Sequence, residues 1–471
     1  MQDQRESDVI ARAKLKQREQ LEQYEQARIR RDFTSAVPTS DSEVKRRLRD
    51  LGHPICLFGE DAFARRERLK IVVVTNGAVS APAEPSRAPP THRDQTEAFF
   101  THGSAELLDA RRTITESSTK AAKNRLDAER SMPPFDGREC TNYWDSQEVV
   151  AASQVGDARP LTAIAFCPFA DLIGVAGWSG DINVFASQSL EQTCSLRGHD
   201  DRCCSIAWSP SDSSLMHLVS GGVDKTVRLW SLSSEAGTSA SGMGTSETPV
   251  LGPLSGLEGH ELKVNRVAVH PHHPQFVFST SDDETWRMWD VVKQQELLLQ
   301  EGHVAPVFGI AVHPDGSLVA TSDTAGVIRV WDIRTGRSVL GFEGQHADQV
   351  IGLDFSPSGY SLASCSGDNT VRIWDLREKR NIEILSAHEK LVSCVKFAGQ
   401  RGDVLMTAGY DCVARVWRTN DFKNVKNLPI HETRIMAADI RADGKAIATA
   451  CYDRTFKIWQ NPSKQDVKME V

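Results

Sequence analysis

The sequence lacks the features that mark membrane, secreted and zinc-binding proteins. No apolar run approaches the roughly 20 residues that a membrane-spanning helix needs. The charged stretch after Met1 has no apolar segment of the kind found in a signal peptide. None of the 10 cysteines has the Cys-x-x-Cys spacing of common zinc sites. We therefore expect an intracellular, soluble protein with reduced thiols, no metal and no cofactor.

Signatures of catalysis are also missing. There is no G-x-x-x-x-G-K-[ST] phosphate loop, no G-x-S-x-G nucleophile and no H-E-x-x-H metalloprotease motif. His270, His272, His273 and His313 lie beside prolines at predicted strand ends, so we interpret them as turn residues instead of metal ligands. The sequence predicts no catalytic residue and no enzyme.

Tryptophan is absent from the first 140 residues, although the chain has 10. Residues 1–140 contain 25 basic and 23 acidic residues, so residues 141–471 contain 30 and 40. The net charge of -8 is unlike that of a protein that coats nucleic acid nonspecifically. The change in composition near residue 140 predicts a boundary between an N-terminal extension and a separate C-terminal domain.

The C-terminal part is repetitive. Six tryptophans are separated by 59, 42, 43, 43 and 42 residues, and a fixed period of this length predicts a repeat array: Trp230, Trp289, Trp331, Trp374, Trp417 and Trp459. The one longer interval contains residues 233–249, which are small and polar and which we interpret as a flexible surface insertion. Alternating apolar segments between turn signals predict short antiparallel strands within each period.

Each period also carries a histidine, a hydroxyl residue and an aspartate at fixed distances before the tryptophan. Five periods have the full set of four: His199, Ser220, Asp224 and Trp230; His260, Ser279, Asp283 and Trp289; His346, Ser364, Asp368 and Trp374; His388, Thr407, Asp411 and Trp417; His431, Thr449, Asp453 and Trp459. Because a buried carboxylate and a buried imidazole both need partners, we predict that each set forms a structural hydrogen-bonded group.

These residues resemble WD40 repeats over residues 155–460, and the resemblance implies an all-β, seven-bladed β-propeller. A degenerate first blade has Ser179 in the aspartate position and Phe185 in the tryptophan position. The fourth blade keeps His303, Thr321 and Trp331 but has Ala325 where the aspartate is expected. Residues 147–153 are expected to supply the outer strand of the last blade and so close the ring.

The face that carries the histidine and aspartate loops is the recognition surface that this architecture implies. The repeat register places aromatic and basic side chains there, and these suit a protein partner or an RNA backbone: Trp178, Arg202, Lys263, Lys390, Tyr410, Arg434 and Tyr452.

A second motif lies in the N-terminal extension, which we expect to be helical and partly disordered. Residues 41–70 predict two short helices joined by an apolar turn, a helix–turn–helix hairpin too small to be stable without a partner. The pattern V-K-x-x-L-R-x-L-G-x-P-I-x-L-F-G-E-x-x-x-x-R-R-E-R-L resembles the splicing factor motif. The residues that we predict to bind a partner are Leu48, Leu51, Gly52, Pro54, Leu57, Phe58, Gly59, Glu60 and Arg66.

Together, the motif and the repeats resemble the Prp4-type WD40 proteins of the U4/U6 small nuclear ribonucleoprotein. The resemblance implies a nuclear, non-enzymatic scaffold in pre-mRNA splicing, within the U4/U6 and U4/U6·U5 particles. Its implied partners are a Prp3-type protein, a cyclophilin-type isomerase and, directly or indirectly, the U4/U6 RNA. Another WD40 adaptor, such as a ubiquitin-ligase substrate receptor, is the alternative.

The expected organisation has six parts: a charged helical or disordered segment (1–40), the motif hairpin (41–72), a disordered linker (73–100), a helical segment (101–140), the propeller (147–460) and a tail (461–471).

Overall fold

The computed structural model describes residues 41–51, 62–75, 104–131, 144, 150–210, 217–232, 249–399, 401–428 and 431–460. The chain divides into two compact units, Met1–Phe99 and Phe100–Val471, which are described separately below. The predicted segments 1–40 and 461–471, and all but one residue of the insertion 233–249, lie outside the described residues. Among the helices that the structure describes, none is both long and apolar enough to cross a membrane.

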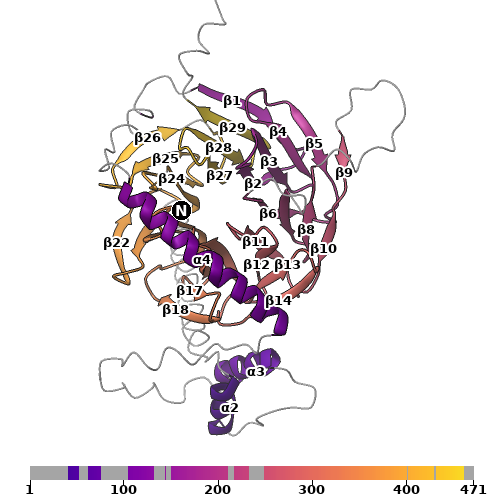
Figure 1. Cartoon of the computed structure of the whole chain (residues 1–471), viewed down its shortest axis with the longest axis vertical. Coiled ribbons are helices and arrows are strands. Elements are labelled where there is room, and N and C mark those ends of the chain that lie inside the picture. The colour runs from indigo at the N-terminus through magenta and orange to yellow at the C-terminus, as the bar shows by residue number, and fades with distance from the viewer. Residues whose placement is uncertain are drawn as a thin grey trace, which may run out of the picture. The chain divides into compact units, whose positions relative to one another are not determined.

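The second unit contains seven sheets, each built on four antiparallel strands, arranged as blades around a ring (Figure 1). This confirms the predicted seven-bladed, all-β propeller. The blades in order are β2 (Leu161–Phe166), β3 (Leu172–Gly177), β4 (Ile182–Ala186) and β5 (Gln192–Leu196); β6 (Cys203–Trp208), β7 (Leu218–Gly222), β8 (Val227–Trp230) and β10 (Ser255–Leu257); β11 (Val264–Val269), β12 (Phe276–Ser281), β13 (Trp286–Asp290) and β14 (Gln295–Gln300); β15 (Val307–Val312), β16 (Leu318–Asp323), β17 (Ile328–Asp332) and β18 (Arg337–Phe342); β19 (Val350–Phe355), β20 (Ser361–Ser366), β21 (Val371–Asp375) and β22 (Arg380–Leu385); β23 (Val392–Ala398), β24 (Val404–Gly409), β25 (Ala414–Arg418) and β26 (Asn424–Leu428); and β27 (Ile435–Ile440), β28 (Ala446–Cys451), β29 (Thr455–Gln460) and β1 (Val150–Val155).

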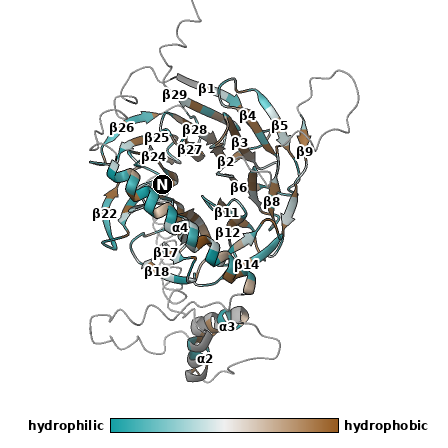
Figure 2. Ribbon diagram, in the orientation of Figure 1, coloured by the Kyte–Doolittle hydropathy of each residue, from teal (hydrophilic) through white to brown (hydrophobic). Residues whose placement is uncertain are grey.

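The core of the ring lies between neighbouring blades. The second strand of each blade is packed on both faces, so strands such as β12 and β24 are buried along their whole length. Figure 2 colours the ribbon of the blades by hydropathy. Aromatic side chains bridge the blades: Phe342 of blade four stacks on Trp374 of blade five with ring centres 4.3 Å apart. Burial of these faces supplies the main driving force for folding, at about 25 cal/mol per Å² of apolar surface.

The ring is closed by strand β1, which pairs antiparallel with β29 from Val150 opposite Gln460 to Val155 opposite Thr455. Of the predicted closing segment, 147–153, residues 150–153 lie in this strand, which continues to Val155, and residues 147–149 lie outside the described residues. Close by, Trp144 is buried and its indole Nε1 donates a hydrogen bond to the Gly444 carbonyl at 3.0 Å. A further departure from simple repetition is β9 (Val250–Leu251), which adds to the outer edge of β5 in parallel.

Helix α4 (Ala105–Ser131) crosses one face of the ring (Figure 1). Its Arg125 makes a two-pronged ion pair with Asp315, with both N–O distances 2.8 Å. Its Glu129 accepts a hydrogen bond from the Tyr360 hydroxyl at 2.9 Å. Asp315 and Tyr360 lie in the loops between the first and second strands of blades four and five. The helix therefore covers the face opposite the histidine and aspartate loops, which leaves the predicted recognition face uncovered by α4.

The first unit contains α2 (Asp41–Asp50) and α3 (Ala62–Thr75). Val44 and Leu48 of α2 pack with Leu69 of α3, and Leu51 joins this small cluster. Arg66, another residue of the predicted partner-binding set, is also buried, with 5% of its surface exposed. Gly52, Pro54, Leu57, Phe58, Gly59 and Glu60 lie outside the described residues.

Candidate functional site

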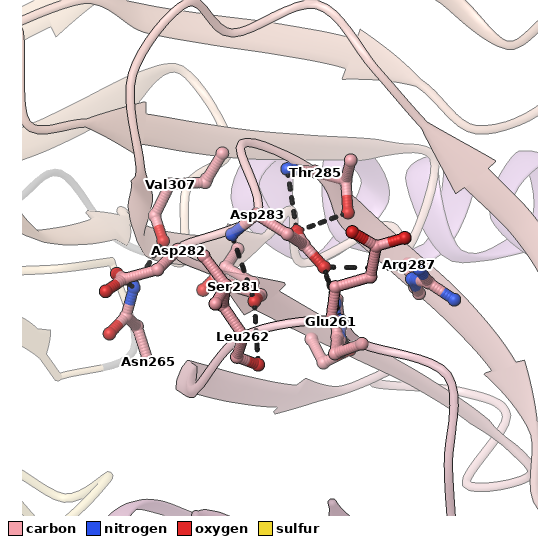
Figure 3. Close-up of polar contacts among 12 residues, drawn as sticks. Glu261, Leu262, Asn265, Ser281, Asp282, Asp283, Thr285, Arg287 and Val307 are labelled. Carbon is pink, nitrogen blue, oxygen red and sulfur yellow. Dashed lines mark hydrogen bonds and ion pairs between the residues drawn. The ribbon is translucent and has the colours of Figure 1, made fainter. Parts of the chain in front are cut away.

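The histidine and aspartate loops are held in place by the hydrogen-bonded set of each blade. In blade three, Trp289 Nε1 donates to Ser279 Oγ at 2.7 Å. His260 joins Ser279 through Nε2 at 2.7 Å and Asp283 through Nδ1 at 2.8 Å. Asp283 also accepts hydrogen bonds from the backbone N–H and hydroxyl of Thr285 (Figure 3). A chain of bonds thus runs from the core of the blade to the turn at its surface.

The same arrangement recurs in blades two, five and six, where the histidine Nδ1 lies 2.8–2.9 Å from Asp224, Asp368 and Asp411 respectively. Burial opposes ionisation of Asp224, but the hydrogen bonds from His199 and Thr226 outweigh burial and lower its pKa to about 2. The aspartates are therefore structural anions that fix the loops in position.

Blade four corrects the prediction that its set lacks an aspartate. Asp323 comes two residues after Thr321 instead of four, and its Oδ2 lies 2.9 Å from His303 Nδ1. Its other oxygen accepts from the backbone N–H groups of Ala325 and Val327, which fixes the turn. The second residue after the hydroxyl position can therefore supply the carboxylate in place of the fourth.

Blades one and seven do not form the set. In blade one, Asp157 stands where the other blades have histidine, and Ser179 donates a hydrogen bond to it. In blade seven, His431 Nε2 lies 2.7 Å from Thr449 Oγ1, but its Nδ1 is 3.9 Å from Asp453, beyond hydrogen-bonding distance. Burial and the charge of Lys457 lower the pKa of His431 to about 4, so this imidazole is neutral at physiological pH.

A backbone hydrogen bond that recurs in the blades sets which positions of the histidine and aspartate loops lie side by side. The residue that precedes each aspartate position donates its backbone N–H to the carbonyl of the residue three places after the histidine position. This bond joins Tyr452 to Arg434 at 3.1 Å in blade seven, and Trp178 to Pro160 at 2.9 Å in blade one. Two positions that are about 18 residues apart in sequence therefore lie side by side in every blade.

These positions bring five of the predicted face residues into one continuous row across blades six, seven, one and two. We call this row the aromatic–arginine ladder: Tyr410, Arg434, Tyr452, Trp178 and Arg202. The Arg434 guanidinium lies 4.1 Å from the Tyr452 ring centre and 5.4 Å from that of Tyr410. Trp178 and Tyr452 meet edge to face with ring centres 5.6 Å apart, and the Arg202 guanidinium lies 4.8 Å from the Trp178 ring centre.

The ladder has the chemistry of a docking surface. Its aromatic members are partly exposed, and stacking on the rings holds the arginine side chains in fixed positions while their N–H groups stay available. Fixed aromatic and arginine side chains are the residue types that contribute most to protein interfaces.

The two predicted lysines lie elsewhere. Lys263 forms an ion pair with Asp282 of its own blade at 3.3 Å, and Lys390 is exposed in the loop before β23. Lys263 lies in blade three, away from the ladder, whereas Lys390 lies in blade six beside Leu391, whose carbonyl accepts the Tyr410 N–H at 2.9 Å.

The ring also encloses a cavity of about 740 Å³, which the sequence reasoning missed. It is bordered by the first strands of the blades and includes Arg266, Asp354, Lys396 and Asp439. Lys396 Nζ lies 3.2 Å from Asp354 Oδ1, and burial raises the pKa of Asp439 to about 6. The sequence contained a sign of this cavity, because charged residues interrupt first strands that are otherwise apolar.

Comparison with known proteins agrees with this architecture. The family described as IFT122 first beta-propeller matches residues 160–460, and the family described as pre-mRNA processing factor 4 (PRP4) like matches residues 44–71. The chain belongs to the WD-repeat β-propeller family, because the propeller match covers more than half of it.

The N-terminal match and the curated relatives are more specific. An uncharacterized WD repeat-containing protein of Schizosaccharomyces pombe is 34% identical over 50% of this chain and 50% of its own length. The U4/U6 small nuclear ribonucleoprotein PRP4 of Saccharomyces cerevisiae is 29% identical over 56% of each chain, and human Prp4 is 36% identical over 42% of this chain and 39% of its own. The chain thus spans about half the length of the curated relatives it matches. Within the propeller family it is similar to the Prp4-type WD-repeat proteins.

Proposed function

We propose that this protein is a non-enzymatic scaffold of pre-mRNA splicing that acts in the nucleus as a component of the U4/U6 particle and of the U4/U6·U5 particle. The observation that carries the proposal is the presence of two parts in one chain: a PRP4-like motif at residues 44–71 and a WD-repeat propeller after it. Propellers alone serve many functions, so the motif selects among them.

In this proposal the aromatic–arginine ladder docks another protein of the U4/U6 particle, of the Prp3 type. The ladder favours a protein over RNA because the part of the chain that holds the propeller carries the negative net charge, and RNA affinity rests mainly on cations. The hairpin of residues 41–72 recruits a cyclophilin-type isomerase. Binding at two places would raise the effective concentration of each partner near the other.

The direct test is capture of the tagged full chain from nuclear extract at low salt, followed by sequencing of the bound RNA. U4 and U6 RNA should be enriched over other small nuclear RNAs. Their absence from a capture that retains other proteins would overturn the proposal and favour a different WD40 adaptor, such as a ubiquitin-ligase receptor.

Two variants separate the two docking places. Arg434→Ala combined with Tyr452→Ala removes the centre of the ladder and should lower capture of the Prp3-type protein at least tenfold. The double change Leu57→Asp and Phe58→Asp should instead abolish capture of the cyclophilin-type protein. Arg380→Ala, whose side chain is 71% exposed on an outer strand, is the matched control and should leave both partners bound.

A further inference from the structure

Blade seven has a cysteine at a position that lies beside the histidine in blades two, four and six. Cys451 comes two residues after Thr449, where blades two and six have Gly222 and Gly409. A Cβ atom on either glycine would lie 2.7–2.8 Å from Nδ1 of that blade's histidine. In blade four the same position is Asp323, which reaches His303 directly. A side chain at this position is therefore beside the histidine Nδ1.

Cys451 lies in the blade whose histidine and aspartate are too far apart to form a hydrogen bond. His431 Nδ1 has no hydrogen-bond partner among the residues that the structure describes, although the side chain is only 1% exposed. Blade five has Ser366 in place of cysteine, and there the histidine and aspartate stay 2.9 Å apart. The nitrogen of His431, the Sγ of Cys451 and an oxygen of Asp453 all lie within 4.8 Å of one another.

We propose that His431, Cys451 and Asp453 form a binding site for a divalent cation of the zinc class. A thiolate, an imidazole nitrogen and a carboxylate are the three ligand types that zinc takes in proteins. In a tetrahedral zinc site neighbouring ligand atoms are about 3.4–3.8 Å apart, so the ligands need to move by less than about 1 Å. Water would occupy the fourth position.

Charge and access fit this site. A dication with one thiolate, one carboxylate and a neutral imidazole has no net charge, which suits a buried position. The Asp453 side chain is 28% exposed, so a cation has a route to the site from the loop face. The hydrogen bonds that Cys451 makes in the structure are weaker than a bond from its thiolate to a metal ion. Its Sγ lies 2.9 Å from the Thr433 hydroxyl and 3.3 Å from the Arg434 carbonyl.

The site would act on the aromatic–arginine ladder, because the two share their backbone. Tyr452 lies between Cys451, at the end of β28, and Asp453, in the turn that follows. The Arg434 carbonyl contacts the Cys451 sulfur. Bound cation would fix the turn that carries Tyr452 and the loop that carries Arg434.

The test uses the purified full chain, stripped of metal by a chelator and titrated with Co²⁺. We expect one cobalt per chain and the sulfur-to-cobalt charge-transfer absorption that reports a thiolate ligand. Cys451→Ser should remove that absorption and weaken cobalt binding at least tenfold, while the protein stays folded because blade five uses serine at this place. Cys412→Ser, at a partly exposed thiol of blade six, is the matched control and should keep the absorption.

Zinc should also raise the melting temperature of the wild-type protein and not that of Cys451→Ser. A folded wild-type chain without the absorption would overturn the proposal, and so would an absorption that persists in Cys451→Ser. Neither measurement depends on splicing partners. Failure of the metal site would therefore leave the proposed splicing function untouched, and the reverse also holds.

Discussion

His303 Nδ1 donates a hydrogen bond to Asp323 Oδ2 at 2.9 Å, although Asp323 lies two residues nearer in sequence than the aspartate of other blades. Asp323 is 1% exposed and accepts two further bonds from the turn. Blade four therefore keeps its set through a carboxylate from a different position, whereas Ala325, at the expected position, is exposed.

Replacing this carboxylate should destabilise the propeller. Asp323→Ala leaves the buried His303 Nδ1 without its partner and should lower the free energy of unfolding by about 2–4 kcal/mol. Ala325→Asp is the control and should change it by less than about 0.5 kcal/mol because the site is exposed. Urea denaturation followed by tryptophan fluorescence measures both, and equal effects of the two changes would contradict this assignment.

Trp144 should contribute more to stability than its place before the repeats suggests. It is 1% exposed and packs in the cluster between blades six and seven. Trp144→Ala should cost about 3–5 kcal/mol. Trp178→Ala, at a partly exposed ladder position, should cost much less and act on partner binding instead. A melting temperature unchanged by Trp144→Ala would show that the indole does not support the closing blade.

Asp439 should make stability depend on pH. Burial raises its pKa to about 6 in the folded protein, against about 3.9 when unfolded. The folded state therefore holds its proton more tightly, and this group's contribution is greatest below pH 4 and is lost as pH rises through about 6.

Asp439→Asn should consequently stabilise the protein at pH 8, by at most about 3 kcal/mol, and have little effect at pH 4. Thermal melts across this range test it. Asp200→Asn is the control, since that side chain is 90% exposed. A variant whose advantage is the same at both pH values would refute the role of ionisation.

Arg125 should hold α4 on the ring. Its ion pair with Asp315 is two-pronged and largely buried, and it also donates to the Ser358 carbonyl. Arg125→Ala should weaken docking by about 1–3 kcal/mol, seen as faster amide exchange along α4 with the strands unaffected. Arg112, which is 79% exposed, gives the control variant. Exchange in α4 that does not change on loss of Arg125 would contradict this role.

The repeated spacing of histidine, aspartate and tryptophan predicted a repeat array of short antiparallel strands, and the resemblance of these repeats to WD40 repeats then implied the propeller. The position of the ladder residues was also predicted, because the repeat register placed Tyr410, Arg434 and Tyr452 on one face. The order in which they stack could be seen only from the backbone hydrogen bonds between the loops. The five residues belong to neighbouring blades because the last repeats meet the first.

Other features could not be predicted. The rule that placed the aspartate four residues after the hydroxyl residue gave Ala325 and missed Asp323, since several backbone paths bring a carboxylate to the same point. Trp144 lies outside the repeats, so periodicity carries no information about it. The parallel pairing of β9 with β5 follows an insertion whose path the sequence does not specify.

The pairing of β1 with β29 has a consequence for synthesis of the chain. The strands of the last sheet come from positions separated by some 300 residues, so β1 leaves the ribosome long before its neighbour exists. Until β29 is translated, the nascent ring has unpaired edges at both ends and offers them to chaperones or to other chains. A premature stop late in the message would therefore yield an open and aggregation-prone product, not a shorter propeller.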